Sequence, residues 1–156
     1  MSDNSPSPSQ GANSRDVAVL GGGSFGTAMA KVLGENGHRV HFWMRDPAQA
    51  EQIRSTGVNK RYMPDVHLEG DIRPTTDLAA VLQISDVVFV AVPSKAFRSL
   101  IRDHKEEFHD DQVVVSLTKG IEEEGFKLMS EILLEEIPRC RSGVLSGPNL
   151  AAEIVN

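Results

Sequence analysis

The sequence is poor in cysteine, in long apolar runs and in basic charge, and each shortage excludes a class of protein. Cys140 is the only cysteine, which excludes an internal disulfide and any metal site built from several cysteines. No run of eighteen apolar residues occurs, so no membrane-spanning helix is predicted. The 16 basic residues against 22 acidic ones give a formal net charge of −6. This balance argues against nucleic acid or an anionic membrane as a partner.

Two kinds of reactive site are also not predicted. The five histidines are scattered, and none stands at metal-ligand spacing from a carboxylate or from Cys140, so no metal site is expected. No Ser-His-Asp arrangement can be argued from the positions of these residue types. The acidic run 122–124 is interpreted as the solvated start of a helix, which the helix dipole favours.

The first residues differ in composition from the rest of the chain. Their stretch SDNSPSPSQGANS cannot bury enough apolar surface to become ordered, so a disordered tail is predicted over 1–15. The stretch has neither the cationic start nor the apolar run of a secretory signal. With the single cysteine, this predicts a cytoplasmic location. The remaining residues, 16–156, are of the right number and composition for one domain.

Apolar segments alternate with segments of helical periodicity along 16–156. The predicted strands are 17–20, 39–44, 68–73, 86–93, 113–117 and 144–145. The predicted helices are 25–33, 47–55, 78–83 with Thr76 or Asp77 as its cap, 94–105, 122–137 with Phe126 on its apolar face, and a last one from Pro148 onward. This alternation predicts an α/β fold of Rossmann type, a doubly wound, mainly parallel sheet with helices on both faces. The expected strand order is 3-2-1-4-5-6.

Three glycines follow the first predicted strand at G-x-G-x-x-G spacing. Gly21 permits a tight turn, Gly23 removes a side chain where the backbone would approach a pyrophosphate, and Gly26 allows close packing of helix on strand. The N–H groups at the start of the helix would then face the anion. A turn that merely tolerates glycine is the alternative. The strand-helix-strand context favours a dinucleotide.

Arg45 stands at the end of the second predicted strand, where NAD-binding sites usually carry an acidic residue for the ribose. A guanidinium can pair with a 2′-phosphate, so Arg45 favours NADP over NAD. In the alternative, Arg45 faces solvent and Asp46 holds the ribose.

The ends of the later strands carry further candidates. Pro93 either lines the cofactor crevice or only ends its strand. Lys119 can bind a phosphate or polarise a carbonyl, although an isolated lysine is also common on an ordinary surface. The turn from Gly147 through Pro148 to Asn149 is either a second anion cradle or a normal helix start.

Several stretches together resemble one family. GGGSFGTAMA, FWMRD, NKRYMP, DVVFVAVPS, SLTKGIE and SGPNLAAEI are similar to the amino-terminal half of bacterial NAD(P)-dependent glycerol-3-phosphate dehydrogenases, over 16–156. The resemblance implies reversible reduction of dihydroxyacetone phosphate to sn-glycerol 3-phosphate, a step that supplies glycerophospholipid synthesis.

The resemblance also implies roles for individual residues. The implied cofactor contacts are Ser24, Phe25, Arg45, Tyr62, Lys119 and Ala151, in addition to the glycines and Pro93. The implied substrate contacts are Lys119, which is also the candidate catalytic cation, Gly147 and Asn149. The family often has Thr or Ser at position 149, which leaves the contact of Asn149 open.

The family continues into a helical substrate domain that this sequence does not contain. We therefore expect the chain to be a cofactor-binding half that is inactive alone, and a homodimer when complete. Another two-domain reductase, for a 3-hydroxyacid or ketopantoate, is one alternative. A noncatalytic dinucleotide-binding module is the other.

Overall fold

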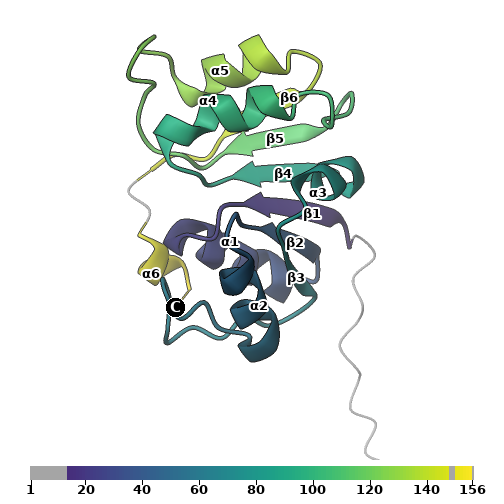
Figure 1. The fold of residues 1–156 in the computed structure, drawn as a ribbon, viewed down its shortest axis with the longest axis vertical. Helices are drawn as coiled ribbons and strands as arrows, with labels where there is room; N and C mark the ends of the chain where they lie inside the picture. Colours follow the sequence, from purple (N-terminus) through teal and green to yellow (C-terminus); the bar gives the residue numbers. More distant parts are fainter. Residues whose placement is uncertain (1–13, 148–149, 156) are drawn as a thin grey trace, which may run out of the picture.

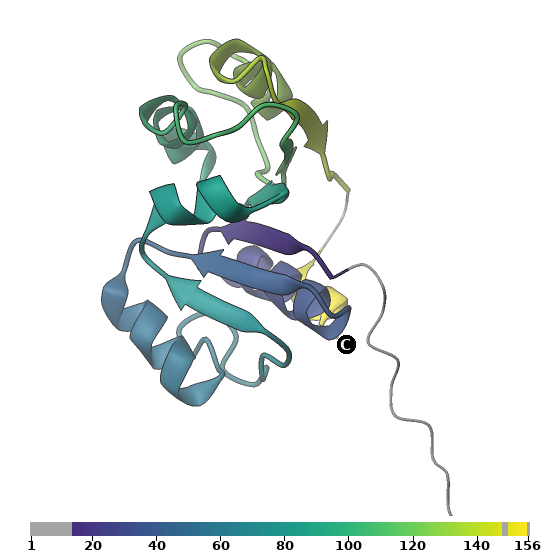
Figure 2. The ribbon, with the colours of Figure 1, turned by 90° about the vertical axis from the view of Figure 1, so that its right-hand side faces the viewer.

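The computed structural model describes residues 14–147 and 150–155, which form one parallel sheet of six strands with helices on both faces (Figure 1). In chain order the elements are β1 (Asp16–Leu20), α1 (Ser24–Glu35), β2 (Arg39–Trp43), α2 (Pro47–Thr56), β3 (Ile72–Thr75), α3 (Leu78–Ile84), β4 (Val87–Val90), α4 (Ser94–Asp103), β5 (Val113–Ser116), α5 (Met129–Glu136), β6 (Arg141–Val144) and α6 (Ala151–Ile154). The strand order is β3-β2-β1-β4-β5-β6, with every neighbouring pair parallel. The predicted doubly wound fold and strand order are confirmed. The strands fan out in Figure 2, as the twist of such a sheet requires.

The sheet separates two apolar cores, because side chains along a strand point alternately to its two faces. Ala18 and Leu20 of β1 belong to the core beneath α3, α4 and α5. Val17 and Val19 of the same strand belong to the core beneath α1 and α2. Strands covered on both faces are expected to be almost wholly apolar, which explains why the central strands were recognisable from sequence.

The start of two helices is fixed by an aspartate. The Asp46 carboxylate accepts a hydrogen bond from the Ala48 amide (2.9 Å), with Pro47 at the first helical position of α2. The Asp77 carboxylate accepts one from the Ala80 amide (3.1 Å) at the start of α3. Of the two cap candidates for α3, the structure therefore selects Asp77.

The predicted helix over 122–137 is wrong in its first half, since α5 begins only at Met129. Residues 121–128 form a turn, closed by a bridge between Ile121 and Leu128. The Glu122 carboxylate pairs with Arg98 of α4, and the acidic run is therefore not a helix start. Phe126 is 76% exposed in the left-handed region (φ 51°) instead of packing on an apolar helix face. The helix begins instead where the Glu131 carboxylate accepts a hydrogen bond from the Leu128 amide (2.7 Å).

The two edge strands were misplaced by a few residues. The third strand is Ile72–Thr75 rather than 68–73, because Leu68 is buried from a loop and its amide bonds to the Gly57 carbonyl (2.7 Å). The sixth is Arg141–Val144 rather than 144–145. The first residues of β6 are polar, so no apolar run marks the strand in the sequence. Its position is set by pairing with β5 from Val113 onward.

The two ends of the chain are described only in part. Residues 1–13 of the predicted tail lie outside the described residues. The carbonyl of Arg15, the last residue of that tail, accepts a hydrogen bond from the Arg39 amide (3.0 Å). At the other end, Pro148 and Asn149 lie outside the described residues, and α6 packs beside α1 (Figure 1). Within 14–147 and 150–155, no helix is both long and apolar enough to cross a membrane.

Candidate functional site

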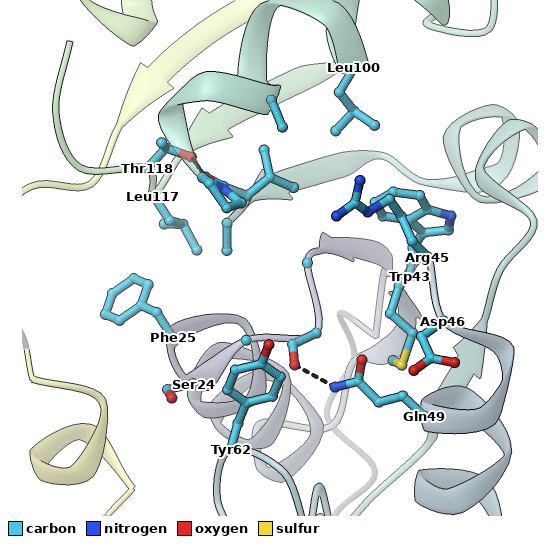
Figure 3. A pocket seen from close by; sticks show the side chains of 18 of the residues that line it. Ser24, Phe25, Trp43, Arg45, Asp46, Gln49, Tyr62, Leu100, Leu117 and Thr118 are labelled. Atoms are coloured by element: carbon cyan, nitrogen blue, oxygen red, sulfur yellow. Dashed lines mark hydrogen bonds between the residues drawn. The ribbon is translucent and has the colours of Figure 1, made fainter. Parts of the chain in front are cut away.

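A cleft of about 790 Å³ lies at the carboxyl ends of β1, β2, β4 and β5 (Figure 3). Its walls come from the residues that follow each strand: the glycine turn after β1, Arg45 after β2, Pro93 after β4 and Lys119 after β5. The chain order reverses between β1 and β4, and ligands of such sheets bind in the crevice at that point. The volume lies within the range of sites for small molecules and cofactors.

The glycines of the turn after β1 are needed for different reasons. Gly21 has φ 123°, and a Cβ there would lie 2.3 Å from the Ala91 carbonyl oxygen. A Cβ on Gly26 would lie 1.9 Å from the Gly21 carbonyl oxygen, so Gly26 sits beneath the turn and allows α1 to pack closely. A Cβ on Gly23 would meet nothing within 4 Å. The protein's own packing therefore does not require glycine at 23, and the free space in front of it suits a ligand.

The amino terminus of α1 opens into the same cleft. Ser24 and Phe25 begin the helix and line the cleft, as Figure 3 shows. Among the described residues, no side chain caps this helix at Gly23. The first N–H groups of a helix lack intrahelical partners and carry a partial positive charge, so this end can hold an anion.

Arg45 lies exposed at the opposite end of the cleft from Phe25 (Figure 3). Asp46 also lines the cleft, but one of its carboxylate oxygens is engaged in capping α2. Arg61 is a further cation of the lining, and its guanidinium carbon lies 5.4 Å from the centre of the Tyr62 ring. Sequence reasoning singled out Tyr62 and missed Arg61, because a cation in an irregular segment has no periodicity to mark it.

The end of β5 is tied to the end of β4 just before Lys119. The Thr118 hydroxyl donates to the Val92 carbonyl (2.8 Å), and the Leu117 amide donates to the Val90 carbonyl (2.8 Å). Lys119 is exposed and lines the cleft. It also lines a second hollow of about 420 Å³, whose wall includes Gly147.

The structure thus brings most of the singled-out residues together. The main cleft is lined by Gly21, Gly23, Ser24, Phe25, Arg45, Tyr62, Pro93, Lys119 and Ala151. Lys119 and Gly147 meet at the second hollow, whereas Asn149 lies outside the described residues. In the described part of the chain, no cluster of three or more His, Cys, Asp or Glu side chains could hold a metal ion.

Two amide side chains that bind the glycine turn were not predicted from the sequence. Gln49 and Asn59 both donate to the Gly22 carbonyl, and the dashed line in Figure 3 marks the bond from Gln49. Gln49 could have been suspected from its place in the first turn of the helix after β2. Asn59 lies in an irregular segment, and its contact depends on the fold of distant residues.

Residues 16–156 match the sequence model of a family described as the NAD-dependent glycerol-3-phosphate dehydrogenase N-terminus. The chain belongs to this family. A relative from Pseudomonas syringae pv. tomato, named glycerol-3-phosphate dehydrogenase [NAD(P)+], is 56% identical over 138 residues, which are 88% of this chain and 40% of that protein. The family resemblance inferred from the sequence motifs is confirmed.

Solved structures agree with membership of the glycerol-3-phosphate dehydrogenase family. The crystal structure of glycerol-3-phosphate dehydrogenase from Coxiella burnetii superposes with a TM-score of 0.85 and 32% identity, over 91% of this chain and 43% of that one. A ketopantoate reductase from Ralstonia eutropha gives a TM-score of 0.65 at 21% identity, over 82% of this chain and 40% of that one, and this likeness shows the fold alone. The chain spans about 40% of the length of its curated relatives.

Proposed function

We propose that this chain is the dinucleotide-binding part of an NAD(P)-dependent glycerol-3-phosphate dehydrogenase. The observation that carries the proposal is the empty space at Gly23, which lies in front of the uncapped start of α1 and at the switch point of the sheet. A pyrophosphate fits this space, because it is an anion that the helix terminus and the close backbone can hold. Membership of the family supports the same cofactor class.

The two ends of the cleft suit the two ends of a dinucleotide. Arg45 would hold a 2′-phosphate at the adenosine end, which favours NADP over NAD. In the competing interpretation, Asp46 holds the ribose of NAD with the carboxylate oxygen that does not cap α2. Phe25 and Tyr62 would contact the cofactor along the cleft, with Pro93 on the opposite wall.

Lys119 is the candidate catalytic cation. When bound, the nicotinamide would supply the hydride to the ketone carbon or accept it in reverse, and a proton donor would complete the reduction at the carbonyl oxygen. Lys119 would place its ammonium group beside the carbonyl oxygen of dihydroxyacetone phosphate and stabilise the charge that develops there. The second hollow, between Lys119 and Gly147, is where the substrate would approach, with Asn149 as a further proposed contact.

The wider setting is part of the proposal. The complete reaction would interconvert dihydroxyacetone phosphate and sn-glycerol 3-phosphate for glycerophospholipid synthesis, in the cytoplasm, by a protein that is a homodimer when complete. Because the chain spans about 40% of its relatives, we expect no turnover from the 156 residues alone. The ketopantoate reductase alternative shares the fold but lacks the family match.

A cofactor titration and a chimera test the proposal. Trp43 is the only tryptophan and lines the cleft, so its fluorescence should change saturably with NADPH and NADH. The chain should then replace the matching part of the Pseudomonas syringae relative, to which it is 56% identical, and the chimera should reduce dihydroxyacetone phosphate.

Lys119→Met should abolish turnover of the chimera, and NADPH should still bind saturably, although more weakly because Lys119 is also a proposed cofactor contact. Lys95→Met is the matched control, because Lys95 is an exposed lysine that pairs with Glu123 and lies outside the cleft lining. Full activity of Lys119→Met would reject Lys119 as the catalytic cation, and saturable binding by the chain with an inactive chimera would leave a noncatalytic dinucleotide-binding module as the better interpretation. The absence of any saturable signal from the unchanged chain would overturn the proposal.

A further inference from the structure

The turn between β1 and α1 rests on a closed hydrogen-bond network. Asn59 Nδ2 donates to the Gly22 carbonyl oxygen (2.9 Å) and to Thr27 Oγ1 (2.8 Å). Gln49 Nε2 donates to the same Gly22 oxygen (2.7 Å) and to Asn59 Oδ1 (3.2 Å). Thr27 Oγ1 donates to the Gly23 carbonyl oxygen (2.7 Å). Three side chains from three separate segments thus hold two consecutive peptide carbonyls of the turn.

Every hydrogen of these side chains that can donate is in use. The side-chain NH2 group of Asn59 donates to two acceptors, and so does that of Gln49. The Thr27 hydroxyl donates one hydrogen bond and accepts another. Asn59 and Thr27 are fully buried, so water does not compete for these bonds. A network that is buried and fully satisfied fixes its members in one arrangement.

The bonds to Gly22 also determine which way the next amide points. The C=O and N–H of a trans peptide point in opposite directions, and no peptide bond between described residues is cis. Because Asn59 holds the Gly22 oxygen on the buried side of the turn, the Gly23 N–H points to the outer side. Within 14–147 and 150–155, no hydrogen bond uses that N–H as its donor.

The same asparagine reaches a second part of the cleft wall. Its main-chain carbonyl oxygen accepts hydrogen bonds from the main-chain amides of Tyr62 (3.2 Å) and Met63 (2.8 Å). The residue that holds the glycine turn therefore also holds the segment that carries Tyr62 into the cleft. One buried residue therefore contacts both walls, the glycine turn through its side chain and the Tyr62 segment through its main chain.

We infer that Asn59, Gln49 and Thr27 are positioning residues that aim the Gly23 N–H at the cofactor's pyrophosphate before the cofactor binds. The inference rests on the proposed dinucleotide site. Asn59 and Thr27 are buried behind the turn and act through the peptides of Gly22 and Gly23, whereas Gln49 holds the Gly22 carbonyl and also lines the cleft. A merely structural network would stabilise the fold without changing the affinity of the folded protein for the cofactor.

The test compares three variants of the 156-residue chain. Gln49→Met keeps the length of a half-buried side chain and removes its donors, Thr27→Val keeps the shape and removes the hydroxyl, and Thr27→Ser restores the hydroxyl. We expect Gln49→Met and Thr27→Val each to weaken the binding of NADPH and of NADH equally, by about 10- to 150-fold, as for the loss of one charge-assisted hydrogen bond. Thr27→Ser should recover most of the affinity.

Gln83→Met is the control, because Gln83 is exposed on α3 outside the cleft lining. Thermal melting of each variant shows that the folded chain is being titrated. Wild-type affinity in both Gln49→Met and Thr27→Val would overturn the inference while leaving the proposed function intact, and failure of Thr27→Ser to recover affinity would also count against it. No saturable binding to the unchanged chain would instead reject the proposed function.

Discussion

Glycines 23 and 26 belong to one motif, yet replacing each with alanine should have opposite consequences. A methyl group at 23 meets no protein atom within 4 Å, and the backbone there (φ −80°, ψ −175°) suits any residue. Alanine should therefore leave the fold intact, or stabilise it by about 0.4–1 kcal/mol through the unfolded chain. The same methyl group projects into the space proposed for the pyrophosphate.

The cost at Gly26 can be worked from one distance. Its added Cβ would lie 1.9 Å from the Gly21 carbonyl oxygen, whereas ordinary contact begins at 3.4 Å. Helix and turn would have to separate by about 1.5 Å in a close-packed region. Such overpacking costs about 1–3 kcal/mol or more, which lowers the melting temperature by at least about 3 °C in a chain of this size.

Two measurements on the same samples separate the roles of the two glycines. Gly23→Ala should melt at or above the wild-type temperature and bind NADPH about 10- to 150-fold more weakly, as when one charge-assisted bond is lost. Gly26→Ala should melt at a lower temperature. Unchanged NADPH affinity in Gly23→Ala, or wild-type stability in Gly26→Ala, would refute this reasoning about the turn.

Two further predictions concern the segment after Lys119. Phe126→Gly should raise the free energy of unfolding by about 1 kcal/mol, as measured by urea denaturation. A bulky residue at φ 51° is strained, and this ring is 76% exposed and so contributes little packing. A less stable variant would show that the ring does contribute packing. The second prediction concerns acid. Hydrogen bonds from Arg98 lower the pKa of Glu122 below its usual 4.5, and those from Arg102 and Arg98 lower that of Glu136 despite its burial. A carboxyl group whose pKa is lowered by folding stabilises the fold at pH values above its unfolded-state pKa. This contribution is lost as the pH falls through the lowered pKa of the folded state, so the melting temperature should fall when the pH is taken below 4.5. Arg98→Met should flatten that drop, and an equally steep drop in the variant would show that other carboxylates cause it.

The central strands and the glycine turn were predictable because their signals are local. Val17–Leu20 is apolar on both faces, and the spacing of Gly21, Gly23 and Gly26 is readable without any knowledge of the fold. The turn over 121–128 was not predictable, since its Glu122 pairs with Arg98, 24 residues earlier in the chain. Local periodicity contains no information about such a partner.

Some residues of the candidate site could likewise be predicted from the sequence, and others could not. Lys119 and Arg45 could be singled out because each stands where a recognisable strand ends, and parallel strands end together at one edge of the sheet. Asn59 could not be singled out, because its side chain binds atoms of residues that lie 32 and 37 positions earlier in the chain. Its amide is informative only once both segments are in place.

The position of the cleft relative to the two cores has a mechanical consequence. Trp43 belongs to the core beneath α3, α4 and α5, and the next residue, Met44, belongs to the core beneath α1 and α2; both line the cleft. Residues of both cores therefore reach the cleft, and a ligand bound there would contact two interiors that the sheet otherwise keeps apart. A substitution that loosens either interior is therefore expected to disturb the lining of the cleft, even where it lies far from the ligand.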